Sequence, residues 1–176
     1  TKGASISWTN KINVKHNGPI FFICNEFCDA LPIDQFKQEN GELKLKKIYL
    51  KNSSELSYLY TKTNKKIPKF YDNINNEDII EVSNDQKNIL KKVFELLSKR
   101  TGILVLFDYG PLNKKNIDTL QSIYEKKKCG IFDDPCFSDI THHIDFQYIK
   151  SLAKIHNLKC YGPMTQRKFL LTFGAK

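Results

Sequence analysis

Glycine is sparse and scattered in this chain of 176 residues, where the eight glycines all stand singly. None of them forms G-x-G-x-x-G or G-x-x-x-x-G-K, the patterns with which a loop wraps the phosphates of a nucleotide. No G-x-S-x-G surrounds a serine, so the sharp turn that exposes a serine nucleophile is missing as well. The sequence gives no support to nucleotide hydrolysis or to serine-type acyl transfer.

Long apolar runs are missing too. No stretch approaches the roughly 18 residues needed to cross a bilayer, so we expect no membrane span. Residues 1–20 lack the apolar core of a secretory signal and the Arg-rich amphipathic pattern of a transit peptide, so no targeting segment is visible in this chain. With 40% hydrophobic residues, the composition is that of a globular domain able to bury one core.

Paired cysteines are also absent. The chain has five cysteines, an odd number, and no two of them form C-x-x-C. Neither a zinc ribbon nor a thioredoxin-type site is therefore predicted. We expect reduced, partly buried thiols in a reducing compartment.

Positive charge is abundant, with a formal net charge of +9. Such a charge favours anionic partners, and a basic nucleic-acid-binding module is one alternative for function. The lysines, however, are interleaved with asparagines in loops such as "TKTNKKIPK" at 61–69. That arrangement is typical of a solvated surface, so nucleic acid is not the expected partner.

Two apolar runs predict strands that are buried on both faces. "FFIC" at 21–24 and "ILVLF" at 103–107 have no polar alternation, which is typical of parallel strands inside a sheet. Between them, Ser83 and Gln86 have the spacing of a capping box, and apolar residues then recur at helical spacing. We expect a helix of about four turns, closed by Gly102, that joins the strands in a parallel crossover. The predicted fold class is α/β.

The remaining segments are predicted as follows. In residues 37–78, "ELKLKKIYL" and "ELSYLYTKT" predict a solvent-facing β-hairpin that is an insertion on the domain. A short strand is expected at Ile79 and Ile80. Further expected elements are a helix near 116–127, a helix ended by Asn157, a possible strand at 158–161, and a helix over 165–173 that begins at a Thr N-cap.

Acidic residues follow both apolar strands. Glu26 and Asp29 follow the first strand and Asp108 follows the second, so the three carboxylates meet at one sheet edge if the strands are parallel neighbours. For Asp29 and Asp108, capping of the next helix or turn is an equally good interpretation. Glutamate is a poor cap, which favours a functional role for Glu26.

A second group of polar residues lies in "DITHHIDF" at 139–146. His143 and Asp145 match two ligands of the iron site built from two histidines and one carboxylate. The required distal histidine is not found at an expected position, because His16 lies in a polar lead-in and His156 in a predicted helix. We therefore expect no metal, and a histidine that holds a loop by hydrogen bonds.

Several motifs resemble, in order, those of one known family. "NEFCDALPIDQF" resembles N-E-F-F-D-A-L-P-V-x-Q-F of the MidA-like methyltransferases. "EVS", "LFDYG", "DTLQSIY", "DITHHIDF" and "GPMTQRKFLLTFG" follow in the family's order, so that the likeness runs from about Trp8 to Gly174.

The resemblance implies a Rossmann-like class I methyltransferase fold with S-adenosylmethionine as the methyl donor. It also implies a protein-arginine methyltransferase that is mitochondrial, acts in respiratory complex I assembly and has a complex I subunit as its protein substrate. The family's Gly-rich donor loop lies upstream of "FFIC", and its closing strand follows "FLLTFG". We therefore expect residues 1–176 to be the central and later part of a methyltransferase domain, with residues 37–78 as the insertion.

The site predictions combine the strand ends with the resemblance. The predicted catalytic residues are Glu26, Asn25 and Asp29. The predicted donor-binding residues are Asn25 and Asp108. The predicted substrate-binding or supporting residues are Tyr109, Thr141, His143 and Asp145. Glu26 is expected to grip the guanidinium of an arginine substrate through two parallel hydrogen bonds.

Two departures from the family pattern are visible. Cys28 stands at the second aromatic of N-E-F-F, which should loosen local packing, and Gln121 stands where the family often has Arg. An alternative function is a non-enzymatic assembly or scaffold protein that keeps a vestigial Rossmann-like fold. Binding of the donor distinguishes an enzyme from such a scaffold.

Overall fold

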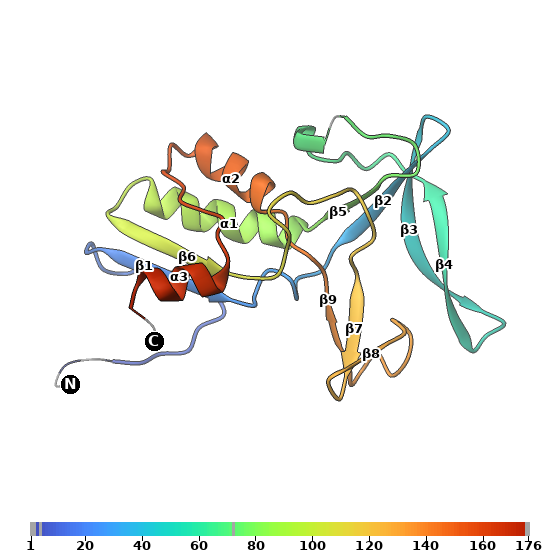
Figure 1. The fold of residues 1–176 in the computed structure, drawn as a ribbon, viewed down its shortest axis with the longest axis horizontal. Helices are drawn as coiled ribbons and strands as arrows, with labels where there is room; N and C mark the ends of the chain where they lie inside the picture. The colour runs from blue at the N-terminus through green and yellow to red at the C-terminus, as the bar shows by residue number, and fades with distance from the viewer. Residues whose placement is uncertain (1–2, 4, 72, 175–176) are drawn as a thin grey trace.

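Two parallel strands lie at the centre of the region that carries the predicted site. In the computed structural model, which describes residues 3, 5–71 and 73–174, β1 (Ile20–Asn25) pairs in parallel with β6 (Gly102–Phe107). Phe22 lies opposite Leu104, and Asn25 lies opposite Phe107. The predicted parallel pair is confirmed, and Figure 1 shows the two strands side by side.

Helix α1 (Asn84–Leu97) precedes β6 in the chain. The Ser83 hydroxyl accepts a hydrogen bond from the Gln86 N–H at 3.1 Å, which confirms the predicted N-terminus. The helix has 14 residues and ends at Leu97, so Gly102 does not close it. Gly102 instead begins β6, because the chain turns through residues 98–101 first.

One face of the β1–β6 pair packs on the helices. The main core contains Leu90, Phe94, Ile144 and Ile149, with Phe22 and Leu104 packed against it. On the other face, Phe21 is 72% exposed and Ile23 is 75% exposed. The described residues cover this face only in part, at Phe107, whose ring lies 5.1 Å from the ring of Phe169. The prediction of burial on both faces is therefore wrong for β1.

A four-stranded antiparallel sheet lies beside the helices, at the right of Figure 1. Its order is β4-β3-β2-β5, with β2 (Asp34–Glu39), β3 (Glu42–Lys51), β4 (Glu55–Lys62) and β5 (Ile79–Val82). The predicted hairpin is β3–β4, and the predicted short strand is β5. The sheet has a core of its own, made of Phe36, Leu45, Ile80 and Val82, so part of the hairpin is buried.

The segment predicted as a helix near 116–127 is a hairpin. β7 (Gln121–Tyr124) pairs antiparallel with β8 (Lys127–Cys129) and with β9 (Asp139–Thr141). Glu125 and Lys126 have φ of 47° and 65°, the left-handed pair that a tight hairpin turn requires. Strand pairing on both sides of β7 stabilises an extended backbone where the sequence pattern alone favoured a helix.

The remaining elements follow the prediction except at 158–161. α2 (Phe146–Ile155) is followed by Asn157 at φ 58°, and α3 (Gln166–Thr172) begins after the Thr165 cap. Residues 158–161 form no strand. η1 (Lys69–Tyr71) is a short 3-10 helix before β5.

None of the helices in the described ranges is long and apolar enough to cross a membrane.

Candidate active site

The carboxyl ends of β1 and β6 meet at one edge, as predicted. Asn25 is the last residue of β1, and the next N–H, that of Glu26, donates to the Phe107 carbonyl at 2.8 Å. The chain then leaves the sheet at Glu26 from one strand and at Asp108 from the other. Parallel pairing thus brings Asn25, Glu26, Asp108 and Tyr109 to one rim.

Glu26 is exposed at this rim, with its backbone in the left-handed region at φ 46°. Such a backbone is uncommon for a residue other than glycine, and it marks the abrupt end of the strand. The Tyr109 hydroxyl donates a hydrogen bond to Glu26 Oε1 at 3.3 Å, and the Glu26 charge raises the pKa of Tyr109. Among the described residues, the second carboxylate oxygen of Glu26 has no donor, which leaves it available to a ligand.

Asp108 ties the two strand ends together. Its Oδ2 accepts a hydrogen bond from the Cys28 N–H at 2.9 Å, and its Oδ1 accepts one from the Tyr109 N–H at 2.8 Å. This is the turn-capping role that was the alternative interpretation. Cys28 itself is 1% exposed, so the smaller side chain is still fully enclosed by the core. The contact of Asp108 with a donor stays a prediction.

Asp29 is buried just below the rim, at 4% exposure. Burial and the nearby Asp108 raise the pKa of its carboxyl. Within the described residues, Asp29 Oδ1 has no hydrogen-bond partner, and its main-chain oxygen accepts from the His142 N–H at 3.0 Å. A buried oxygen without a donor is costly, so Asp29 Oδ1 is free to accept a hydrogen bond from a water molecule or a ligand.

His142 is a residue that sequence reasoning missed. It is 4% exposed, and burial lowers the pKa of its imidazole. Its Nδ1 lies 3.2 Å from the His143 carbonyl oxygen, whereas its Nε2 has no partner in the part of the chain that the structure describes. The histidine doublet in "THHID" was the available signal, but only His143 matches the histidine of the family's motif.

Thr141 is the last residue of β9, and His143 and Asp145 follow on the segment that leads into α2. The Thr141 hydroxyl oxygen accepts a hydrogen bond from the Gln121 side-chain amide at 3.3 Å, and Asp145 caps α2. The segment reaches the rim through its backbone, because the Ile144 N–H donates to the Tyr109 carbonyl at 2.9 Å. The structure therefore joins this segment to the rim, but it records no side-chain contact between these three residues and Glu26.

Glu81 is the second residue that sequence reasoning missed. It lies on β5 with a side chain that is 0% exposed, and it pairs with Lys114 Nζ at 2.8 Å. Gln35 Nε2 and the Thr119 N–H also donate to it, at 2.8 and 2.9 Å. Burial alone would raise the pKa of Glu81, but the Lys114 ammonium and these hydrogen bonds hold it below its ordinary value.

The Glu81 network fixes the backbone at His143. Lys114 Nζ donates to the His143 carbonyl at 2.6 Å, and the His143 N–H donates to the Thr119 hydroxyl at 2.9 Å. Both backbone polar groups of His143 are therefore held by residues that bind Glu81. The role of the His143 side chain in holding a loop stays a prediction.

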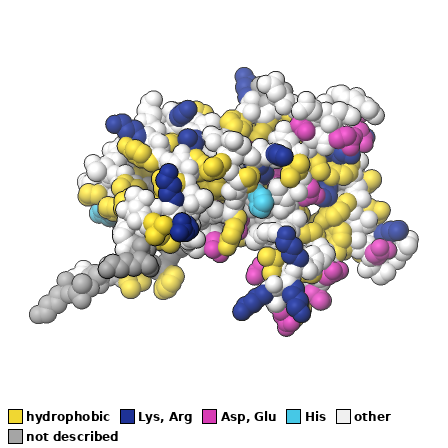
Figure 2. All heavy atoms as spheres, viewed as in Figure 1, with side chains coloured by type: hydrophobic (Ala, Val, Ile, Leu, Met, Phe, Trp, Pro, Cys, Tyr) yellow, Lys and Arg dark blue, Asp and Glu magenta, His cyan; other side chains and the backbone are white. Residues whose placement is uncertain are grey.

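The described residues give no support to a metal site or to a nucleic-acid interface. The described residues contain no cluster of three or more His, Cys, Asp and Glu side chains that could hold a metal ion. On the face shown in Figure 2, lysine and arginine side chains are scattered, and most of the acidic side chains lie on the right of the view. The basic side chains form no continuous patch on this face.

The sequence matches a family model described as "Putative S-adenosyl-L-methionine-dependent methyltransferase" over residues 1–164. The chain belongs to this family. A relative named protein arginine methyltransferase NDUFAF7 homolog, mitochondrial, from Caenorhabditis elegans is 27% identical over 98% of this chain and 41% of its own length. The human protein arginine methyltransferase NDUFAF7, mitochondrial, is 24% identical over 98% of this chain and 39% of its own length.

Solved structures support the fold. The crystal structure of a "likely methyl transferase" from Burkholderia thailandensis, bound to S-adenosyl-homocysteine, matches with a TM-score of 0.75 at 16% identity. The match covers 96% of this chain and 45% of that chain. The Rossmann-like methyltransferase fold is therefore confirmed. The chain spans about two fifths of the length of the curated relatives named above.

Proposed function

We propose that the protein is an S-adenosylmethionine-dependent methyltransferase that acts on arginine in a protein substrate. The observation that carries the proposal is the parallel register of β1 and β6, which sets Asn25 and Glu26 beside Asp108 and Tyr109 at one rim of the sheet. Membership of the methyltransferase family supports the reaction type. The relatives' names support arginine as the acceptor and the mitochondrion as the location. We further propose a complex I subunit as the substrate, as the sequence resemblance implies.

The residues at the rim fit a polar donor molecule. Asn25 is exposed, and its amide, which makes no hydrogen bond to the described residues, offers both a donor and an acceptor. Asp29 Oδ1 is a buried acceptor that lacks a donor within the described chain, and it suits an ammonium or hydroxyl group. S-adenosylmethionine supplies a methyl group on a sulfonium, which is ready for in-line displacement. Asp108 holds the two loops between which such a molecule would lie.

Glu26 is proposed to hold the acceptor. A carboxylate matches the planar guanidinium of arginine through two parallel hydrogen bonds, which fixes the direction of the reacting nitrogen. The Tyr109 hydroxyl donates to Glu26 Oε1 at 3.3 Å, which favours one orientation of the carboxylate and leaves its second oxygen without a donor among the described residues. Since methyl transfer needs mainly positioning, we propose that orienting the acceptor is the main contribution of the two residues. The proton that the methylated nitrogen releases passes through the exposed Glu26 carboxylate to water.

The test is methyl transfer by the full-length protein. Labelled S-adenosylmethionine is supplied with arginine-containing peptides, and the product is hydrolysed and analysed for methylarginine. Label in methylarginine is the expected result. Calorimetric titration of S-adenosylhomocysteine accompanies the assay. Absence of both binding and transfer would contradict the proposal and favour the scaffold alternative.

A further inference from the structure

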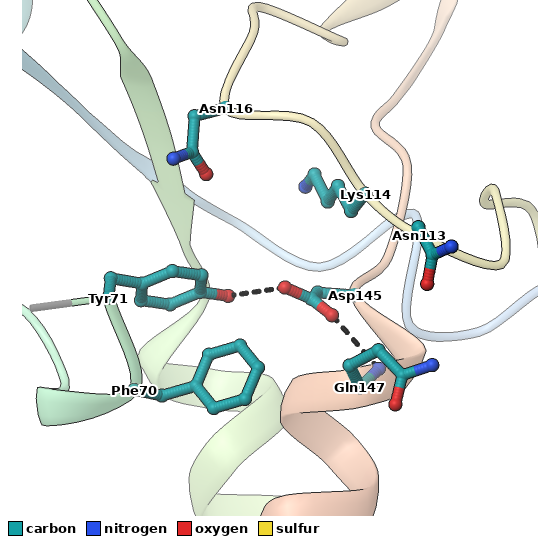
Figure 3. A pocket seen from close by; sticks show the side chains of 7 residues that line it. All are labelled: Phe70, Tyr71, Asn113, Lys114, Asn116, Asp145 and Gln147. Atoms are coloured by element: carbon teal, nitrogen blue, oxygen red, sulfur yellow. Dashed lines mark hydrogen bonds between the residues drawn. The ribbon is translucent and has the colours of Figure 1, made fainter. Parts of the chain in front are cut away.

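A small polar hollow lies beside the start of α2, separate from the Glu26 carboxylate. Its volume is about 220 Å³. Ligand pockets for whole cofactors or drug-sized molecules occupy roughly 300–1,000 Å³, so this hollow suits a single side chain. The lining residues, shown in Figure 3, are Phe70, Tyr71, Asn113, Lys114, Asn116, Asp145 and Gln147.

Asp145 gives the hollow its negative charge. Its Oδ1 is used by the helix, because it accepts from the N–H groups of Gln147 and Tyr148 at 2.9 and 3.0 Å. Its Oδ2 accepts one hydrogen bond, from the Tyr71 hydroxyl at 3.1 Å. Burial and the Asp145 charge raise the pKa of Tyr71, so this hydroxyl keeps its proton. A carboxylate oxygen has two lone pairs, so Oδ2 has room for a second donor.

Two neighbouring side-chain amides use their nitrogens to donate to other residues. The Gln147 side-chain nitrogen donates to the Leu112 carbonyl at 3.2 Å, and the Asn116 nitrogen donates to Asp78 Oδ2 at 2.9 Å. Their carbonyl oxygens are the ends left without a described partner. The Phe70 ring, which is 44% exposed, adds an aromatic surface of the kind that attracts cations.

Lys114 does not reverse the sign of the charge. Its ammonium donates to Glu81 at 2.8 Å and to the His143 carbonyl at 2.6 Å, and its side chain is 9% exposed. Its charge is therefore balanced by a buried carboxylate. Lys114, Glu81 and Asp145 together leave one negative charge, and Asp145 carries it at the hollow.

We propose that this hollow is a subsite for a guanidinium group, supplied by an arginine of the protein substrate other than the one that is methylated. A guanidinium has five donors, which suits an oxygen-lined hollow that carries one carboxylate and an aromatic face. The subsite is connected to the rim, because Ile144, next to Asp145, donates its N–H to the Tyr109 carbonyl. The assignment of the ligand to a substrate rests on the proposed function, whereas the guanidinium preference does not.

The test separates charge from shape. N-acetyl-arginine methylamide and its neutral isostere, N-acetyl-citrulline methylamide, are titrated into full-length Glu26→Gln protein, which removes the rim carboxylate as a competing site. Binding is followed by the amide NMR signals of Gln147 and Tyr148, whose N–H groups contact Asp145. We expect the arginine compound to bind at least about tenfold more tightly than the citrulline compound.

Asp145→Asn is the informative variant. Asparagine is as good an N-cap as aspartate, so α2 is preserved while the charge is lost. We expect the arginine preference to disappear in this variant. Glu95→Gln is the matched control, since Glu95 lines a separate hollow of about 230 Å³, and its variant should keep the preference.

Two results would overturn the subsite: an arginine preference that survives Asp145→Asn, or no preference in the Glu26→Gln background. Because the readout is binding, loss of the subsite is distinguishable from loss of the proposed methyl transfer. If the protein binds the arginine compound but transfers no methyl group, the subsite is supported and the proposed methyltransferase activity is contradicted.

Discussion

Glu81→Gln is the substitution that tests the buried network most sharply. The Glu81 side chain is 0% exposed and that of Lys114 is 9% exposed, so the variant leaves a buried ammonium without its counter-charge. One oxygen also becomes an NH₂ group, which faces either Lys114 Nζ and the Thr119 hydroxyl or Gln35 Nε2 and the Thr119 N–H. Removing one partner of a buried ion pair costs about 3–5 kcal/mol. We expect a loss of unfolding free energy of that size.

Urea unfolding of the full-length protein measures the effect, with Glu42→Gln as the control. Glu42 pairs with Lys62 at the surface, where their side chains are 48% and 72% exposed, so its loss should cost at most about 1 kcal/mol. A Glu81→Gln variant as stable as the Glu42→Gln variant would refute the idea that Glu81 holds the network. The double variant with Lys114→Met should recover part of the loss, since the unpaired charge is then gone.

The pH dependence of stability gives the same test without a second variant. Because the pKa of Glu81 is lower in the folded protein than its ordinary value of 4.5, the ionised carboxylate stabilises the fold at neutral pH. That contribution is fully present above 4.5 and is lost as the pH falls through the folded pKa. The difference in stability between wild type and Glu81→Gln should therefore narrow below pH 4.5. A constant difference would contradict the assigned ionisation.

Three further variants test other contacts. Asp29→Asn should raise the urea midpoint at pH 7, because burial and Asp108 raise the pKa of Asp29 and make its ionised form costly in the folded protein. This gain should vanish below pH 3.8, the ordinary pKa of the carboxyl, where Asp29 is protonated in both states. Gly110→Ala places a Cβ 2.5 Å from the Ile144 carbonyl oxygen, so circular dichroism melts should show a loss of about 1–3 kcal/mol. Tyr109→Phe removes the 3.3 Å hydrogen bond to Glu26, and kcat for methyl transfer should fall by about tenfold with the melting temperature unchanged.

Local patterns predicted the elements that local interactions fix. Ser83 and the apolar spacing after it placed the start of α1, and uninterrupted apolar runs placed β1 and β6 in parallel. These signals are carried by neighbouring residues, so they are visible in one sequence. The position of Glu26 and Asp108 at the same sheet edge was predictable from the parallel register alone.

Features that depend on distant residues were missed or misjudged. β7 is a strand because β8 and β9 pair with it, which the helical pattern near 116–127 does not reveal. Exposure of Phe21 depends on what packs over β1, not on the side chain itself. Glu81 acquired its role from Lys114 and Thr119, which lie on a loop more than thirty positions away in the chain.

Glu26→Gln measures the central claim most directly. Labelled methyl transfer to an arginine peptide is compared between wild type, Glu26→Gln and the Glu42→Gln control, with S-adenosylhomocysteine affinity measured in parallel. The account predicts that only Glu26→Gln loses methyl transfer and that all three proteins bind S-adenosylhomocysteine equally. Equal turnover by wild type and Glu26→Gln would contradict it.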